Sequence, residues 1–85
     1  MELIKLTEEL VKSVVKNPED VRIKEFETDE EDNILIQVMV NESDMGAVIG
    51  KAGRIANAIR TIVQASAYIN GNKKVRINID SFEEL

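Results

Sequence analysis

The 85-residue sequence contains no cysteine, no histidine and no tryptophan, and its aromatic residues are one tyrosine and two phenylalanines. Without cysteine there is neither a disulfide framework nor a thiolate site. Without histidine, the commonest general base at neutral pH and the commonest metal ligand are missing. No nucleophile–base pair, metal-ligand cluster or nucleotide-binding loop is evident either. We therefore predict a protein that is not an enzyme and needs no metal or cofactor.

Long apolar runs are absent too. No stretch approaches the ~18 residues that a membrane span requires, and the N-terminus has no basic segment leading into an apolar run. These patterns predict a soluble, cytoplasmic protein that does not bind membranes. The length suits one domain over residues 1–85, and an apolar fraction of 44% is ordinary for a folded one.

Charge is unevenly distributed along the chain, although the total is −5. Residues 1–44 have a net charge of −8, residues 45–79 have +6 with no acidic residue, and residues 80–85 have −3. One uninterrupted cationic stretch inside an acidic protein fits a nucleic-acid partner. Charge alone leaves chance clustering on a solvated surface equally open.

Hydrophobic periodicity predicts a helix and two strands in the first half of the chain. Apolar residues recur at helical spacing over 3–16, and Pro18 stops that helix because the residue before a proline avoids helical dihedrals. Residues 21–28 and 34–40 are the predicted strands. Phe26 falls out of phase in the first strand, which allows a bulge or twist there.

The second half is predicted to contain two helices and a third strand. Ser43 or Asp44 caps a short helix that runs to about Ile49, and a longer helix covers 54–69. The predicted inner stripe of the longer helix is Ile55, Ile59, Ile62, Ser66 and Ile69. The final strand, 74–80, is joined to the second by this helical crossover and must run parallel to it, whereas the first two strands form an antiparallel hairpin. The predicted fold is a two-layer α+β domain with a three-stranded mixed sheet and helices on one face.

The four residues between the two helices, Gly50-Lys51-Ala52-Gly53, are the strongest candidate for a binding site. Glycine permits a tight turn and lets a ligand approach the backbone closely. The longer helix begins directly after Gly53, so its unpaired N–H groups and positive dipole end suit a phosphate. Lys51 and Arg54 can add charge-assisted contacts. Two glycines at this spacing are common by chance, but their place between two helices favours a phosphate grip.

This arrangement resembles the KH domain, whose signature is a GXXG loop between two helices. A helix and a strand precede the core strand–helix–helix–strand unit at about 34–80, as in the type II form. Four segments resemble the small stand-alone bacterial KH proteins of the KhpA type, namely 17–21, 44–46, 48–54 and 58–61. The resemblance covers nearly the whole chain and implies a type II KH fold with the order α-β-β-α-α-β.

The resemblance also implies that the chain clamps about four nucleotides of single-stranded RNA, with the loop on the phosphate backbone. One wall of the groove would consist of the loop and its neighbours, Ile49, Gly50, Lys51, Ala52, Gly53, Arg54 and Asn57. The other wall would include the end of the loop 70–73 and the outward-facing side chains of the last strand, with Lys73, Lys74 and Arg76 as its RNA-binding residues. Phosphate contacts position RNA without specifying its bases, so sequence preference should be weak.

The longer helix carries a candidate interface for a second subunit. Its members are small or polar residues at roughly helical spacing, Ala56, Asn57, Thr61, Gln64 and Tyr68. From the residues alone, a solvated helix face is slightly favoured. The resemblance implies instead that this helix supports a homodimer, and possible heterodimers with a larger KH-containing protein.

Two functions therefore compete. The leading hypothesis is an RNA-binding protein that acts as a regulator or chaperone-like adaptor. The alternative is a protein-interaction module that pairs with another KH protein, with RNA binding secondary. Lys51 and Arg54 favour the first hypothesis, because a degenerate loop would often carry acids there. The acidic segment 29–32 lacks the ligand spacing of a calcium loop, and we predict a solvated hairpin tip.

Overall fold

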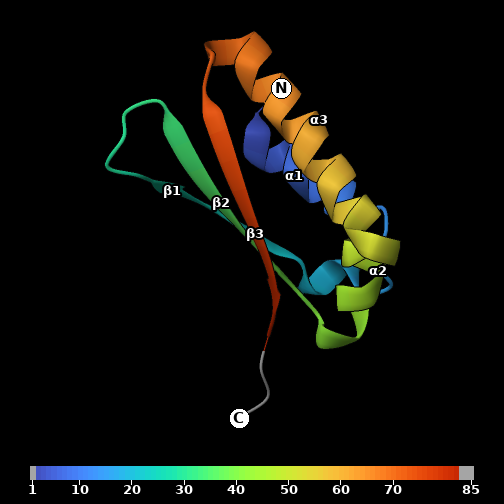
Figure 1. The fold of residues 1–85 in the computed structure, drawn as a ribbon. Helices are drawn as coiled ribbons and strands as arrows, with labels where there is room; N and C mark the ends of the chain where they lie inside the picture. The colour runs from blue at the N-terminus through green and yellow to red at the C-terminus, as the bar shows by residue number, and fades with distance from the viewer. Residues whose placement is uncertain (1, 83–85) are drawn as a thin grey trace.

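The computed structural model describes residues 2–82 (Figure 1). Within them the helices are α1 (Leu3–Lys12), α2 (Met45–Ile49) and α3 (Arg54–Gly71), and the strands are β1 (Arg22–Glu27), β2 (Asn33–Val40) and β3 (Lys74–Ser81). Short 3-10 turns occupy Pro18–Asp20, Glu42–Asp44 and Lys51–Gly53. The sheet order is β1-β2-β3, with β1 antiparallel and β3 parallel to β2. The predicted α+β fold with a mixed sheet is confirmed.

The helices cover one face of the sheet and leave the other open (Figure 1). On the covered face, the side chains of the central strand Ile36, Val38 and Val40 are fully buried. They pack against buried residues of the other elements and their connections, Val11, Val21, Val48, Ile59, Val63 and Ile77. Because side chains alternate along a strand, the intervening residues of all three strands share the open face.

Phe26 lies on this open face, opposite Leu35 of β2. The pairing of β1 with β2 runs without interruption from Arg22 opposite Met39 to Glu27 opposite Ile34. The irregular phase of Phe26 therefore reflects an apolar residue on the open face, and the predicted bulge is absent from this pairing.

The first helix ends at Lys12, four residues earlier than predicted. The backbone N–H groups of Lys16 and Asn17 donate to the carboxylate of Asp44 at 3.0 and 3.1 Å, and Asn17 Nδ2 donates to it at 3.1 Å. Because these N–H groups donate to Asp44, residues 16 and 17 do not continue α1. Asp44 is the N-cap residue of α2, one of the two predicted, but its side chain accepts hydrogen bonds from Lys16 and Asn17 and makes no capping hydrogen bond to that helix.

The buried stripe of α3 differs from the prediction. Its buried residues are Ala56, Ile59, Val63 and Ala67, whereas Ile55, Ile62 and Ile69 are 36%, 46% and 83% exposed. The buried stripe has alanine, a small residue, at both of its ends. The prediction failed because it placed the larger apolar residues inside, and here several of them lie outside.

Candidate nucleic-acid interface

The loop between α2 and α3 has a backbone that only certain residues adopt easily. Gly50 has φ 74° and ψ 178°, Ala52 has φ 54° and Gly53 has φ 75°. A Cβ atom on Gly50 would overlap Ile55 Cγ1 and lie 3.0 Å from the Ile55 backbone nitrogen, so glycine is required there for space as well as for conformation. Around Gly53 the nearest such atom would be Asn57 Nδ2 at 3.7 Å, which leaves room for a side chain.

The loop delivers the N-terminus of α3 to the surface. No side chain caps this end, and no acidic residue lies in the first turn. The Arg54 N–H donates to the Lys51 oxygen of the preceding turn. The N–H groups that follow in the first turn of this 18-residue helix have no side-chain cap, and they lie beside the exposed side chains of Lys51 and Arg54. Backbone donors, the helix dipole and two cations meet at one point, which is a favourable environment for a phosphate group.

The Asp44 carboxylate fixes the position of this loop by tying the start of α2 to the segment that follows α1. Burial raises the pKa of Asp44, but the hydrogen bonds from Lys16 and Asn17 lower it by more, so its pKa lies below the ordinary value of 3.8. Asn17 also donates to Ser43 Oγ at 3.3 Å. Two of the segments that suggested the KH resemblance, around residues 17 and 44, are therefore one structural unit.

On its β3 side, α3 is hydrogen-bonded to the edge of the sheet. Arg60 Nε donates to the backbone oxygen of Ile77 at 3.3 Å, and Arg60 Nη1 donates to Asn57 Oδ1 at 3.3 Å. The Gln64 amide donates to the Lys73 oxygen and accepts from the Val75 nitrogen, both at 2.9 Å. Arg60 is absent from the predicted site residues, and its spacing of three from Asn57 within the acid-free stretch was the signal that could have found it.

The predicted RNA-binding residues fall into two groups. Gly50 to Arg54 and the exposed Asn57 lie together at the N-terminal end of α3, with Ile49 half-buried beside them. Lys73 and Lys74 follow the C-terminal end of that helix, which is about 27 Å long. The Lys74 nitrogen donates to the Asp32 oxygen at 2.8 Å, so β3 begins beside the β1–β2 hairpin.

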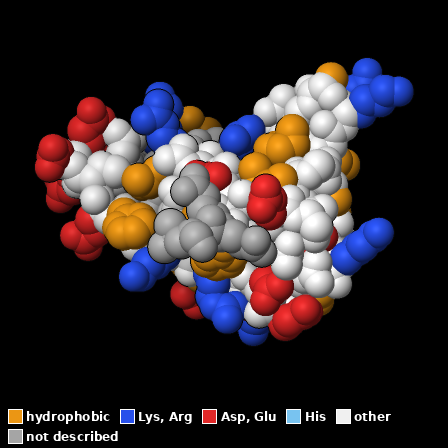
Figure 2. Space-filling model, turned by 90° about the horizontal axis from the view of Figure 1, so that it is seen from below, with side chains coloured by type: hydrophobic (Ala, Val, Ile, Leu, Met, Phe, Trp, Pro, Cys, Tyr) orange, Lys and Arg blue, Asp and Glu red, His pale blue; other side chains and the backbone are white. Residues whose placement is uncertain are grey.

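The acid-free stretch remains free of ion pairs in the described part of the chain. Within residues 2–82 the one ion pair joins Lys12 to Glu8 on α1. Figure 2 shows a group of acidic side chains at the end where the β1–β2 hairpin lies, whereas lysine and arginine side chains are spread around the rest of the view among further acidic ones. No described helix combines the length and the hydrophobicity needed to cross a membrane.

The outer surface of α3 carries an apolar stripe on the flank that faces away from β3. Its five residues are all exposed and spaced alternately by three and four, Ile55, Ala58, Ile62, Ala65 and Ile69. We call this set the isoleucine stripe. Among the residues predicted to contact a second subunit, Ala56 is 1% exposed and belongs to the core, and Gln64 is bound to β3. Asn57, Thr61 and Tyr68 are exposed on the β3 side of the helix.

A family model described as "KhpA/KhpB, KH domain" matches residues 4–79. The chain belongs to this family. It is 50% identical over 74 residues to the RNA-binding protein KhpA of Clostridium perfringens, covering 87% of this chain and 95% of that protein. The RNA-binding protein KhpA of Listeria monocytogenes is 49% identical over 76 residues, with 85% and 96% covered. The expected KhpA-type KH identity is thereby confirmed.

Solved structures share the fold of this KH-family chain at low sequence identity. One is the protein Era in complex with MgGDPNP and part of 16S ribosomal RNA, with a TM-score of 0.67 and 16% identity over 93% of this chain. Another is an Aquifex aeolicus Era variant bound to GDP and aluminium fluoride, with a TM-score of 0.69 and 15% identity over 96%. The chain corresponds to 29% and 31% of those chains, so the likeness concerns one part of each.

Proposed function

We propose that this chain, as one KH domain, binds single-stranded RNA through the Gly50–Gly53 loop and acts as a regulator or chaperone-like adaptor without catalysis. The observation that carries the proposal is the α3 N-terminus, presented uncapped and flanked by exposed cations. Relatives at 49–50% identity bear the name RNA-binding protein. The aliphatic surroundings and the scarcity of aromatic residues suit a KH clamp better than a stacking platform.

In the proposed clamp, both backbone N–H groups and side chains contact the RNA. N–H groups at the start of α3 would hold a phosphate, Lys51 and Arg54 would strengthen that contact, and Asn57 would line the adjacent groove. Arg60, held against Ile77 and Asn57, extends the same wall toward β3. Such contacts favour affinity for RNA over choice of sequence.

The test replaces Lys51 and Ala52 with aspartate and measures binding to a pool of cellular RNA as salt is varied. Aspartate tolerates the left-handed conformation of Ala52, so the fold should survive. We expect binding to be lost, and the parent to show a log–log salt slope of about −0.7 for each phosphate contacted. Lys5→Asp, an exposed charge reversal on α1, serves as the control. Unchanged RNA binding in the double variant would refute the role of the loop.

We also propose that the chain forms a homodimer through α3, with a heterodimer with a larger KH-containing protein as a further use of the same face. The isoleucine stripe supports this, because three exposed isoleucines at heptad spacing resemble a helix-pairing seam. Placing the interface there, instead of on Asn57, Thr61 and Tyr68, keeps the β3 side of the helix available to RNA.

Light scattering at tens of micromolar protein tests the dimer. Ile62 lies at the middle of α3 and is 46% exposed, so Ile62→Lys should give a folded monomer. Thr61→Lys, one residue away on the β3 side, is the matched control and should leave the dimer intact. A parent protein that is monomeric under these conditions contradicts the proposal.

A further inference from the structure

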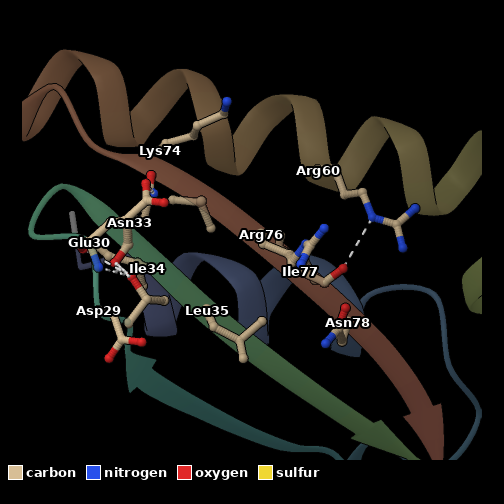
Figure 3. A pocket seen from close by; sticks show the side chains of 12 residues that line it. Asp29, Glu30, Asn33, Ile34, Leu35, Arg60, Lys74, Arg76, Ile77 and Asn78 are labelled. Atoms are coloured by element: carbon tan, nitrogen blue, oxygen red, sulfur yellow. Dashed lines mark hydrogen bonds between the residues drawn. The ribbon is translucent and has the colours of Figure 1, made fainter.

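The open face of the sheet separates the charges of β1 by sign. Along β1 and β2, the side chains on this face form three cross-strand pairs, Arg22 with Met39, Lys24 with Gln37 and Phe26 with Leu35. We call these six residues the open-face patch. In Figure 3, Leu35 projects from β2 on the side away from the helices. Glu25 and Glu27, the acidic residues of β1, lie on the other face. Both charged residues of the patch are therefore basic, in a chain whose net charge is −5.

The open-face patch also presents an apolar surface to solvent. Phe26 is 44% exposed. Leu35 and Met39 are half-buried, and Met39 Sδ accepts a hydrogen bond from Gln37 Nε2 at 3.5 Å. Phenylalanine, methionine and arginine are enriched in protein–protein interfaces, whereas a sheet that binds RNA stacks two or three bases on aromatic side chains. With one aromatic residue, the patch suits a polypeptide better than RNA.

The cations of the open-face patch have no carboxylate partner in the described part of the chain. Within residues 2–82, the one ion pair lies on α1 and involves neither Arg22 nor Lys24. Arg22 Nη1 donates to the backbone oxygens of Glu19 and Val21 at 2.8 and 2.9 Å, which holds the guanidinium in place. Its Nε and Nη2 atoms make no hydrogen bond to those residues, and this edge of a guanidinium can bind a carboxylate through two parallel hydrogen bonds.

The dimensions and charge of the open face indicate which kind of partner fits. Neighbouring strands lie about 4.8 Å apart, so three strands span about 10 Å, close to the diameter of an α-helix. A helix laid along β2 would rest on Leu35 and Met39, with the cations of β1 along one flank. On the other flank, Lys74 and Arg76 belong to the proposed RNA groove and Asp80 is acidic. A second copy placed face to face would bring mostly basic residues together, so charge disfavours it.

We propose that the open-face patch docks an amphipathic helix of a partner protein, with the helix's apolar stripe on the apolar residues of the patch and its acidic residues, along one flank, facing Arg22 and Lys24. This inference rests on the adaptor role in the proposed function and gives that role a class of partner. The helices, with the Gly50–Gly53 loop between two of them, lie on the opposite side of the sheet (Figure 1). RNA on the loop and a helix on the patch would therefore be bound at the same time.

The probe is a fluorescein-labelled peptide of about 18 residues, five helical turns, with leucine along one stripe, glutamate along one flank and glutamine elsewhere. A matched peptide has lysine in place of glutamate. The net charge of −5 by itself favours the lysine peptide. We expect the parent chain instead to bind the glutamate peptide at least about tenfold more tightly, with a ratio that falls as salt is added. Arg22→Gln with Lys24→Gln should abolish this preference, and Phe26→Thr should weaken binding of the glutamate peptide about tenfold.

The matched control is Lys5→Gln with Lys12→Gln, which removes two exposed charges from α1 and should leave both peptide affinities unchanged. If the parent prefers the lysine peptide, or if the Arg22 and Lys24 variant keeps the preference for glutamate, the inference is wrong. Loss of glutamate-peptide binding in Ile62→Lys would place the peptide on the isoleucine stripe and would also contradict it.

A fluorescein-labelled RNA tetramer measures the clamp separately. The Arg22 and Lys24 variant and the Phe26 variant should bind the tetramer like the parent, and saturating glutamate peptide should not displace it. Weaker tetramer binding in these variants would assign the open-face patch to RNA and overturn the inference. If the parent itself fails to bind the tetramer while it binds the glutamate peptide, the clamp is refuted and the docking site is not.

Discussion

The two glycines of the GXXG loop should differ sharply in how they tolerate alanine. Gly50 combines φ 74° with ψ 178°, a region in which a side chain costs about 1–3 kcal/mol. Its new Cβ would also overlap Ile55 Cγ1 and lie 2.9 Å from Ile55 Cβ, and such crowding costs about 1–3 kcal/mol more. Gly50→Ala should therefore destabilise the protein by about 2–6 kcal/mol, a large part of the about 4–13 kcal/mol expected for this length.

Gly53→Ala meets a milder obstacle. Its φ of 75° with ψ 11° is the left-handed helical region, which costs alanine about 1–2 kcal/mol. The nearest atom beyond its chain neighbours would be Asn57 Nδ2, 3.7 Å from the new Cβ. Gly46 lies inside α2 with open space where a Cβ would go, so Gly46→Ala should stabilise by about 0.5–1 kcal/mol. Three substitutions of one kind are thus predicted to have three different outcomes.

Urea unfolding of the three variants at one pH and ionic strength measures these differences. The midpoint should fall most for Gly50→Ala, less for Gly53→Ala, and rise for Gly46→Ala. Ile55→Ala in the Gly50→Ala background should relieve part of the crowding, with a coupling energy of about 0.5–3 kcal/mol. If Gly53→Ala proves as damaging as Gly50→Ala, or if the double variant shows no coupling, the close approach of Gly50 to Ile55 does not govern the loop.

Further predictions concern Asp44 and Gln64. Because the folded-state pKa of Asp44 is lowered, its contribution to stability is present above 3.8 and is lost as pH falls below that value. In Asp44→Asn, the free energy of unfolding should therefore depend less on pH, below the pKa of an ordinary aspartate, than it does in the parent. Urea unfolding at several acidic pH values measures this, and equal pH dependence in parent and variant would contradict the prediction. Gln64→Ala removes two hydrogen bonds to β3 and should cost about 1–2 kcal/mol, with faster hydrogen exchange at Val75. Gln64→Glu keeps the acceptor for the Val75 N–H, so its stability and its Val75 exchange rate should lie between those of the parent and of Gln64→Ala. Unchanged hydrogen exchange at Val75 in both variants would contradict the role of Gln64 in holding β3.

Sequence periodicity was sufficient for the sheet because each strand has one covered face. Ile36, Val38 and Val40 alternate with less apolar residues, and a period of two admits no other arrangement once a helix layer covers one side. The order of connections then determined which strands run parallel. The position of Phe26 could not be predicted, because hydrophobicity does not distinguish an apolar residue on an open face from a core residue.

The phase of α3 could not be predicted in the same way. Two stripes on that helix are apolar, one centred on Val63 and one on Ile62, and the stripe with larger residues is the exposed one. Hydrophobicity ranks isoleucine above alanine, whereas the buried residues at positions 56 and 67 are alanines. A helix with two apolar faces needs tertiary contacts to determine which face is inside.

The loop could be predicted from the four residues Gly50-Lys51-Ala52-Gly53 and their place between two helices. Its spatial relation to the cations that follow α3 could not be predicted from the sequence. Lys74 shares the acid-free stretch with Lys51, yet Lys51 precedes the 18-residue α3 and Lys74 follows it. The predicted groove has the loop on one wall and Lys73, Lys74 and Arg76 on the other, and it does not include Arg60. The structure instead makes Arg60 the connection between them, through its bond to the edge of β3.

The two outer faces of α3 allow the two proposed functions to operate together. Ile62 and Gln64 are two positions apart, so their side chains point about 200° apart around the helix axis. A partner packed on the isoleucine stripe would leave the bonds of Gln64 and Arg60 to β3 untouched. If two copies cross antiparallel near Ile62, their GXXG loops would lie at opposite ends of a helix pair about 27 Å long. RNA that reaches both loops would then gain affinity from effective concentration, whereas a tetramer would not. Ile62→Lys should therefore weaken binding of long RNA while leaving tetramer binding unchanged, and equal weakening of both would mean that the subunit interface and the clamp are not independent.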